Sequence, residues 1–296
     1  MDVFVRLIEI YNKYGIRISG GLFPWHFERN YPIGTTRLHV FQPFMGAAHQ
    51  GKHMSVGGGI SPLEVLVLSS VSRATKPKRI FLIGNAFGWS TLALGLANPD
   101  AQVVAIDALV EGVEAARGFD ITQQIIKKEK LDNISVVEAF SPDDVHEVCQ
   151  KYFDGPIDFA LIDGKHSNEQ QTKDFQVVYQ ELADPGVVFL HDVLNWNMIS
   201  SFNEIRKSYP HMTGEILIRT PSGMGVFHTK TIPKEAKDII DSFCESKDII
   251  QVNRNEVAKR VRKARKIMGF GIQIKDDWRN KETSISFVQN EAKDIE

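Results

Sequence analysis

The chain has 296 residues, of which 43% are hydrophobic, so it is long enough to bury a sizeable core. Its formal net charge of -2 gives no general attraction to nucleic acid or to anionic membranes. No stretch approaches the roughly 20 apolar residues that a membrane-spanning helix needs. The composition therefore predicts a globular protein with no membrane span and no nucleic-acid partner.

Two cysteines, Cys149 and Cys244, lie far apart and without metal-binding spacing, which argues against a disulfide framework and a thiolate zinc site. The first 21 residues interleave charged and apolar side chains, and they lack the apolar core and cleavage site of a signal peptide. Together these features predict a cytoplasmic protein.

Residues 1–59 begin with apolar side chains at helical spacing between positions 3 and 11, which predict a helix. The following aromatic- and glycine-rich stretch predicts loops. We expect this region to act as a lid and to help form an acceptor pocket, although its aromatic side chains fit ordinary core packing equally well. The expected pocket residues are Phe23, Trp25, His26, Phe27, Tyr31, Phe41, Phe44, Trp196 and Asn197.

The second region, residues 60–230, opens with Ser61 as a helix cap and Pro62 as the first helical residue. Short apolar runs then alternate with amphipathic segments, as expected for strands buried on both faces of a parallel sheet. The last two runs flank a turn at 221–223 and predict an antiparallel hairpin. The pattern predicts a Rossmann-like, doubly wound α/β fold, mostly parallel with a C-terminal antiparallel hairpin.

The third region, residues 231–296, is predicted to be a charged, helical C-terminal extension. Its basic run fits a solvated helix face that packs on the domain, and it also fits a surface for an anionic partner or substrate. Residues 1–59 and 231–296 are the segments where we would expect the contact of a homodimer. The basic residues are Arg254, Lys259, Arg260, Arg262, Lys263, Arg265 and Lys266.

A glycine-rich turn, Gly84 to Gly88, separates the first buried strand of the 60–230 region from a helix that Ser90 and Thr91 are expected to cap. Such a turn lets backbone N–H groups approach a ligand beyond the carboxyl ends of the strands. Asp107 ends the next strand, where a carboxylate can bind ribose hydroxyls. A third glycine is missing, which disfavours a bound pyrophosphate and hence an NAD-dependent oxidoreductase.

Residues 54 to about 228 resemble the S-adenosylmethionine (SAM) dependent O-methyltransferases related to catechol O-methyltransferase and to the macrocin and sugar O-methyltransferases. The resemblance implies a class I methyltransferase fold, SAM as the methyl donor, and a small-molecule hydroxyl of a natural product, sugar or phenolic compound as the acceptor. Its motifs occur in family order: MSVG at 54–57, ISP at 60–62, LIGNAFGWSTLAL at 82–94, VVAIDA at 103–108, LIDGKHS at 161–167 and PGVVFLHDV at 185–193.

The resemblance also implies which residues contact SAM. Asp107 would bind the ribose, and the residues after the third strand would lie beside adenine, where Phe140 fits ordinary core packing almost as well. The full set is Met54, Gly84, Asn85, Ala86, Phe87, Gly88, Trp89, Ser90, Asp107, Ala108, Ala139, Phe140, Ser141 and Asp163.

Two departures from the family bear on catalysis: Leu82 and Val193 stand where relatives have an acid and a metal-binding asparagine. The resemblance implies that Asp163, His191 and Asp192 hold Mg²⁺ or another divalent cation, with His166 as an alternative ligand. Carboxylates at strand ends also commonly do no more than accept hydrogen bonds from loop amides.

The implied catalytic residues are His166, Asp163 and Lys165. The position of His166, three residues after Asp163, matches the general base of sugar-modifying relatives, while Lys165 is its rival. A surface or capping role for His166 is the alternative. The departures at Leu82 and Val193 also leave open a catalytically degenerate SAM-binding or scaffold protein.

Overall fold

The computed structural model describes residues 2–20, 36–41, 53–110, 112–244, 259, 271–277 and 282–288, in two compact units, 1–244 and 245–296. The first unit contains α1 (Val3–Lys13), β1 (Ile16–Gly20), β2 (Thr36–Phe41), β3 (His53–Gly59), α2 (Pro62–Thr75), β4 (Arg79–Ile83), α3 (Trp89–Ala97), β5 (Gln102–Asp107), α4 (Val113–Glu129), β6 (Ile134–Glu138), α5 (Val145–Tyr152), β7 (Ile157–Ile162), α6 (Asn168–Gln180), β8 (Leu182–Leu190), α7 (Ile199–Ser208), β9 (Thr213–Leu217), β10 (Met224–His228) and α8 (Lys234–Phe243). The second contains β11 (Gly271–Asp277) and β12 (Glu282–Val288).

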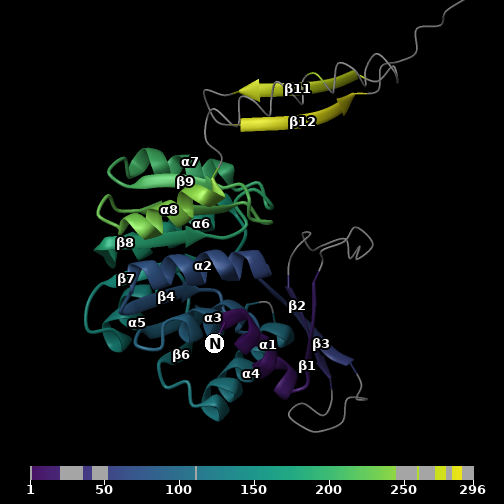
Figure 1. The fold of residues 1–296 in the computed structure, drawn as a ribbon, viewed down its shortest axis with the longest axis vertical. Coiled ribbons are helices and arrows are strands. Elements are labelled where there is room, and N and C mark those ends of the chain that lie inside the picture. Colours follow the sequence, from purple (N-terminus) through teal and green to yellow (C-terminus); the bar gives the residue numbers. More distant parts are fainter. Residues whose placement is uncertain are drawn as a thin grey trace, which may run out of the picture. The chain divides into compact units, whose positions relative to one another are not determined.

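The main sheet of the first unit has seven strands in the order β6-β5-β4-β7-β8-β10-β9 (Figure 1). The first five strands of this order are parallel, and β10 runs antiparallel to both of its neighbours. The predicted doubly wound sheet with a C-terminal antiparallel hairpin is therefore confirmed, and it is the class I methyltransferase fold. The strand order reverses between β4 and β7, where ligands bind in folds of this kind.

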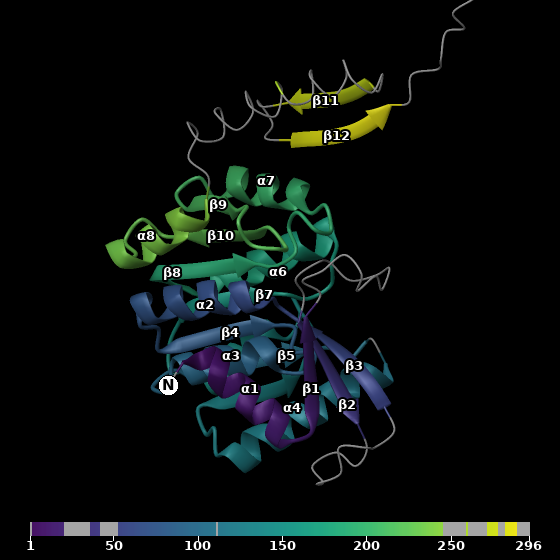
Figure 2. The same ribbon diagram turned by 45° about the vertical axis from the view of Figure 1, so that its right-hand side comes forward.

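Alternate residues of each central strand enter two separate cores. In β4, Ile80 and Leu82 face one core, whereas Phe81 and Ile83 face the other. Helices α1–α4 and α8 cover the first face and α5–α7 cover the second, with α1 and α3 on the same side of β4 (Figure 2). Because both faces are buried, the central strands are apolar along most of their length, with polar residues near their ends.

The N-terminal region contains more regular structure than the sequence indicates. Strands β2 and β3 lie in the stretch predicted as loops. Together with β1 they form a three-stranded antiparallel sheet in which β2 is the central strand. The glycines that suggested loops instead make room for packing, because Phe87 lies against Gly57 and Trp89 against Gly59. The predicted pocket residues Phe23, Trp25, His26, Phe27, Tyr31 and Phe44 lie outside the described residues.

Two helix starts test the capping predictions. Ser61 and Glu64 form a capping box at the start of α2, as expected from Ser61 and Pro62. The cap predicted for α3 is wrong, because Gly88 is the N-cap and no side chain caps this helix. The hydroxyl of Thr91 donates instead to Asn85 Oδ1 at 3.0 Å, and it therefore fixes the glycine turn rather than the helix end.

Helix α1 is tied to α4 through a buried carboxylate, Glu129, whose side chain is 4% exposed. Glu129 accepts hydrogen bonds from Arg6 at 2.9 Å, from Lys13 at 2.6 Å and from the Tyr14 hydroxyl. Burial alone would raise the pKa of Glu129, but these hydrogen bonds and the positive charges of Lys13 and Arg6 hold it below its usual range.

We expect Glu129→Gln to lower the free energy of unfolding at pH 7 by about 2 kcal/mol, because charged hydrogen bonds are lost. A lowered pKa in the folded state stabilises the protein above the unfolded value, about pH 4.3, and this contribution disappears as the pH falls through the folded value. Urea unfolding at pH 7 and below pH 4 measures the difference. Glu9→Gln is the matched control, since Glu9 is exposed and, among the described residues, bonds only Arg6. Equal losses in both variants would contradict the prediction.

The end of the chain differs from the helical extension expected for residues 231–296. Helix α8 packs against α2 within the first unit, and β11 and β12 form an antiparallel pair in the second. Of the basic run, Lys259 is described and helical, and the other members lie outside the described residues. Among the described residues, no helix has both the length and the apolar character needed to cross a membrane.

Candidate functional site

The carboxyl ends of the parallel strands place the predicted site residues along one edge of the sheet. The glycine turn follows β4, Asp107 ends β5, and Asp163 follows β7 directly. His191 and Asp192 follow β8, the neighbour of β7 in the sheet. The polar groups singled out in the sequence therefore meet at one edge, as parallel strands require.

The turn after β4 has a backbone that only glycine fits at its first position. Gly84 has a φ of 94°, and a Cβ there would lie 2.1 Å from the carbonyl oxygen of Asp163. The amide of Gly84 donates to Ile106 O at 2.9 Å, which holds the turn against β5. The close approach of Gly84 to Asp163 joins the turn to the strand end that carries the acidic cluster.

We expect Gly84→Ala to destabilise the fold by about 3 kcal/mol and to abolish binding of S-adenosylhomocysteine (SAH), because a β-carbon displaces the end of β7. Thermal unfolding and calorimetric titration measure the two effects. Gly15→Ala is the control, because Gly15 also has a positive φ, 74°, but no described residue lies within 4 Å of its Cβ position. Wild-type SAH affinity in Gly84→Ala would contradict this reading of the turn.

Asp107 organises the turn. Its Oδ2 accepts from the amides of Asn85 and Ala86, both at 3.0 Å, and its Oδ1 accepts from the amide of Leu109 at 2.9 Å. A carboxylate has about four lone-pair positions, so one acceptor position remains on Oδ1. Asp107 is thus both a support of the turn and an acceptor at the site edge.

Several residues predicted to contact a cofactor have side chains that point elsewhere. Phe87 and Trp89 are 3% and 1% exposed and belong to the core, where Trp89 packs against Phe4 and Tyr11. Asn85 is also buried and bonds Thr91, Thr122 and Ala86 O. At these positions only the backbone is left to face a ligand, and the side chains hold the turn in place.

The remaining predicted cofactor residues differ in how far they are buried. Ser90 and Ala139 are buried, and the Ser141 hydroxyl donates to Asp174 at 2.5 Å. The Phe140 ring is 49% exposed, so it is not core. Met54 and Ala108 are half-buried, Met54 within β3. Exposed apolar surface at Phe140 is what a ligand ring would cover.

Four titratable side chains converge between β7 and β8. The ligand atoms of Asp163, His166, His191 and Asp192 all lie within 4.8 Å of one another. His166 Nε2 is 3.1 Å from Asp192 Oδ2, and His191 Nδ1 is 3.0 Å from Asp163 Oδ1 and 3.4 Å from Asp192 Oδ2. The structure thus brings together the three predicted metal ligands and the alternative one.

The charges of this cluster are strongly coupled. Burial disfavours the charged rings, but Asp163 and Asp192 raise the pKa of His166 to about 9, and Asp163 and Glu64 raise the pKa of His191 well above its usual range. Burial would raise the pKa of both aspartates, yet the two rings hold these pKa values below their usual range. The two carboxylates therefore favour protonated rings, and a divalent cation held by the same carboxylates would neutralise them and lower the pKa of both rings.

A divalent cation fits this donor set on two grounds. His191 Nδ1 is buried and makes no hydrogen bond of acceptable direction, although Asp163 is close. The four ligand atoms also lie within 4.8 Å of one another, so side-chain adjustments could bring them onto one ion. Imidazole nitrogens together with carboxylate oxygens suit a transition metal better than Mg²⁺.

Two residues of the loop after β8, Asn195 and Trp196, contact members of the cluster. Asp192, with a φ of 56°, accepts from Asn195 Nδ2 at 3.1 Å. The rings of His166 and Trp196 are stacked, with centroids 4.9 Å apart and planes 7° apart. Lys165 is exposed. Trp196, 50% exposed, is thus the predicted pocket residue that lies next to the cluster.

Leu82 and Val193, the two departures from the family pattern, are both 0% exposed and belong to the two cores. Neither belongs to the cluster, whose members are Asp163, His166, His191 and Asp192. Sequence reasoning missed Glu64 as part of the site, because a glutamate three residues after Ser61 is typical of a helix start and gives no signal of a distant partner. Its carboxylate Oε2 lies 3.3 Å from His191 Nε2.

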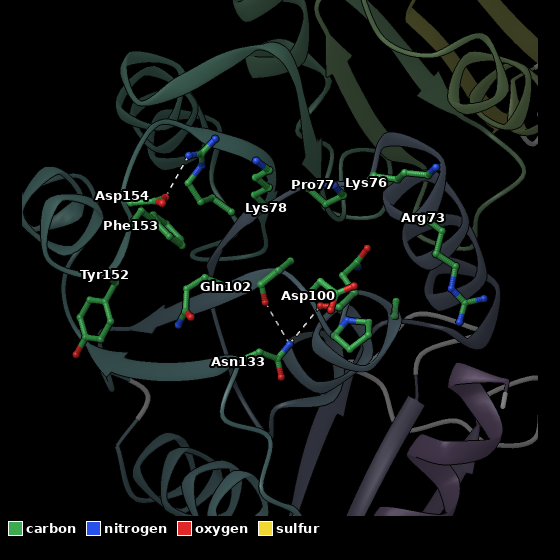
Figure 3. A pocket seen from close by; sticks show the side chains of 15 residues that line it. Arg73, Lys76, Pro77, Lys78, Asp100, Gln102, Asn133, Tyr152, Phe153 and Asp154 are labelled. Atoms are coloured by element: carbon green, nitrogen blue, oxygen red, sulfur yellow. Dashed lines mark hydrogen bonds and ion pairs between the residues drawn. The ribbon is translucent and has the colours of Figure 1, made fainter.

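A hollow of about 830 Å³ lies at the opposite edge of the sheet (Figure 3). It is lined by residues that end helices or begin strands, such as Lys76, Arg79, Gln102 and Asn133. Ligands of doubly wound sheets bind at the carboxyl ends of strands, and this hollow lies at the amino ends. It is therefore separate from the candidate site.

Residues 81–193 match a family described as a methyltransferase domain. No curated protein matches the sequence. The matched segment contains the glycine turn, Asp107 and all four members of the cluster. Glu64, which contacts His191, lies before it in the sequence.

Solved structures similar to this chain include an O-methyltransferase from Bacillus cereus in complex with SAH, at 18% identity and a TM-score of 0.48, covering 57% of this chain and 82% of that one. A putative caffeoyl-CoA O-methyltransferase from Staphylococcus aureus is 17% identical, with a TM-score of 0.48 and coverage of 57% and 84%. The O-methyltransferase TomG from Streptomyces achromogenes, in complex with SAM, is 15% identical, with a TM-score of 0.47 and coverage of 58% and 81%.

Proposed function

We propose that this chain, which carries a methyltransferase domain, transfers a methyl group from SAM to a hydroxyl of a small-molecule acceptor with the help of a divalent cation. The observation that carries the proposal is the convergence of the glycine turn with Asp163, His166, His191 and Asp192 at one sheet edge. SAM supplies an activated sulfonium methyl, so the protein mainly has to align the acceptor and exclude water.

The cofactor would be held by the turn and by the ends of β5 and β6. The backbone from Gly84 to Gly88 would face the methionine part, and the open acceptor position on Asp107 Oδ1 suits a ribose hydroxyl. The exposed Phe140 ring would cover adenine. Because Phe87 and Trp89 are core residues, they would contribute through their backbone alone.

The cation would be held by Asp163, His191 and Asp192, and it would lower the pKa of an acceptor hydroxyl. The cation would also neutralise Asp163 and Asp192 and so lower the pKa of His166. This residue, at the rim of the cluster with a third of its side chain exposed, would then be able to take the hydroxyl proton at Nε2. Lys165, the rival base, is exposed and comes directly before His166. Stacking on Trp196 holds the His166 ring in place.

The acceptor is a ring-bearing or long-chain hydroxyl compound, such as a natural product, a sugar or a phenolic compound. Trp196 offers an apolar ring half-exposed beside the cluster, and Leu194, 46% exposed, lies on the same loop. Aromatic and aliphatic walls with a few polar groups are the usual make-up of a small-molecule site.

Calorimetric titration with SAH and, separately, with NAD⁺ tests the cofactor, and release of SAH from SAM with phenolic and sugar acceptors tests turnover. We expect SAH to bind and NAD⁺ not to bind. NAD⁺ binding without SAH binding would replace the proposal by an oxidoreductase. Binding of SAH without turnover of any acceptor, in the presence of Mn²⁺, Co²⁺ or Mg²⁺, would favour the scaffold alternative.

A further inference from the structure

Glu64 is a buried carboxylate next to the sheet-edge site, and it is too deeply buried to contact a ligand directly. It is 1% exposed and stands in the first turn of α2, where its Oε2 accepts from the Ser61 amide at 2.7 Å. A capping box needs no more than this one contact from its acidic residue. The other acceptor positions of the Glu64 carboxylate are therefore available to partners outside the capping box.

The other contacts of Glu64 come from two distant segments. Oε1 accepts from the amide of Ser222 at 3.0 Å and from the Ser222 hydroxyl, in the turn between β9 and β10. Oε2 also lies 3.3 Å from His191 Nε2. With four donors, all lone-pair positions of the carboxylate are used, so its orientation is fixed from three directions.

This arrangement determines how His191 presents its ring. A neutral imidazole, the form that binds a metal ion, has Nδ1 free as a lone-pair donor when its Nε2–H donates to a carboxylate. In the structure, Nδ1 is the buried atom that lacks a hydrogen bond and faces Asp163 and Asp192. Metal-bound histidines commonly have such a carboxylate on the second ring nitrogen, which fixes the tautomer and increases the basicity of the ligand.

We propose that Glu64 is a positioning residue that holds His191 with Nδ1 directed at the cation site, so that the site prefers a nitrogen-binding transition metal over Mg²⁺. The inference rests on the proposed cation-assisted function. Glu64 acts only through His191, since its remaining contacts go to Ser61 and Ser222. The helix cap of α2 and the β9–β10 turn are thereby coupled to metal affinity.

The test compares Co²⁺ binding by the full-length wild type and by Glu64→Gln, using calorimetry and the visible absorption of Co²⁺. Glutamine is also accepted at this position of a capping box, so the helix start is retained. We expect the Co²⁺ affinity to fall by about 10- to 100-fold, with a changed Co²⁺ spectrum and an unchanged SAH affinity. Mg²⁺ in large excess should not displace Co²⁺ from the wild type.

Glu129→Gln is the matched control, since Glu129 is also a buried carboxylate with three side-chain partners, but it ends α4 on the amino-terminal side of β6, whereas the cluster follows the carboxyl ends of β7 and β8. It should leave the Co²⁺ affinity unchanged. In the His191→Ala background, Glu64→Gln should add no further loss, because the two residues act as one unit. Should Glu64→Gln not fold, Ser222→Ala is expected to weaken Co²⁺ binding by about 2- to 10-fold.

Folded Glu64→Gln with wild-type Co²⁺ affinity and spectrum overturns the inference and leaves the proposed function standing. Equal losses in Glu64→Gln and Glu129→Gln, or additive losses with His191→Ala, overturn it as well. If the wild type binds SAH but neither Co²⁺ nor Mg²⁺, the cation-assisted function fails, and the role of Glu64 fails with it.

Discussion

Replacing His166 with alanine should lower turnover by about 10²- to 10⁴-fold, the usual contribution of a positioned general base, while SAH binds as in the wild type. The reason is its position: Nε2 faces the cluster at 3.1 Å from Asp192, and the ring is held by Trp196. Steady-state release of SAH and calorimetric titration provide the two measurements.

Lys165→Ala is the matched control for His166→Ala, because the two residues are neighbours on the same loop and Lys165 is exposed. We expect Lys165→Ala to keep near-normal turnover. A larger loss in Lys165→Ala than in His166→Ala would assign the base to the lysine. Titration of the His166→Ala variant with Co²⁺ adds a further distinction, because a parallel loss of metal affinity would make His166 the fourth ligand.

The sheet and the convergence of the polar cluster could be predicted because they depend on local patterns. Apolar runs indicate strands buried on both faces, and the carboxyl ends of parallel strands meet at one edge. Knowing that Asp163, His191 and Asp192 follow such strands was sufficient to place them together. Their roles as ligands and that of His166 as base stay predictions, because geometry alone assigns no chemistry.

Side-chain directions at the glycine turn could not be predicted, because they are set by residues distant in the sequence. Phe87 points away from the edge because Gly57 of β3 leaves space for its ring, and the Tyr11 hydroxyl holds its carbonyl at 2.7 Å. The same applies to Glu64, whose local capping role hides a partner 127 residues away. Strand β3 was missed because its sequence, HMSVGGG, ends in three glycines, which resemble loop residues.

Replacing Asp192 with asparagine should have the largest effect on the cation. Asp192 lies in the left-handed region, with a φ of 56°, where asparagine is tolerated as well as aspartate. An asparagine oxygen can still accept from Asn195, which now donates to Asp192 Oδ1 at 3.1 Å. The substitution therefore removes one negative charge and one anionic ligand with little change in the backbone or in packing.

We expect Asp192→Asn to weaken Co²⁺ binding by more than about 100-fold and to reduce turnover as well. Losing a residue that only hydrogen-bonds a metal ligand costs up to about 100-fold, and Asp192 would be a ligand itself. SAH affinity should be retained, because Asp192 is separated from the glycine turn by the end of β7. Asp158→Asn is the matched control: it also removes a carboxylate on this sheet, but at the amino end, where Asp158 accepts from the amides of Lys78 and Arg79. Undiminished Co²⁺ affinity in Asp192→Asn would exclude a cation held between β7 and β8. The most deeply buried carboxylate of the cluster would then contribute nothing to binding.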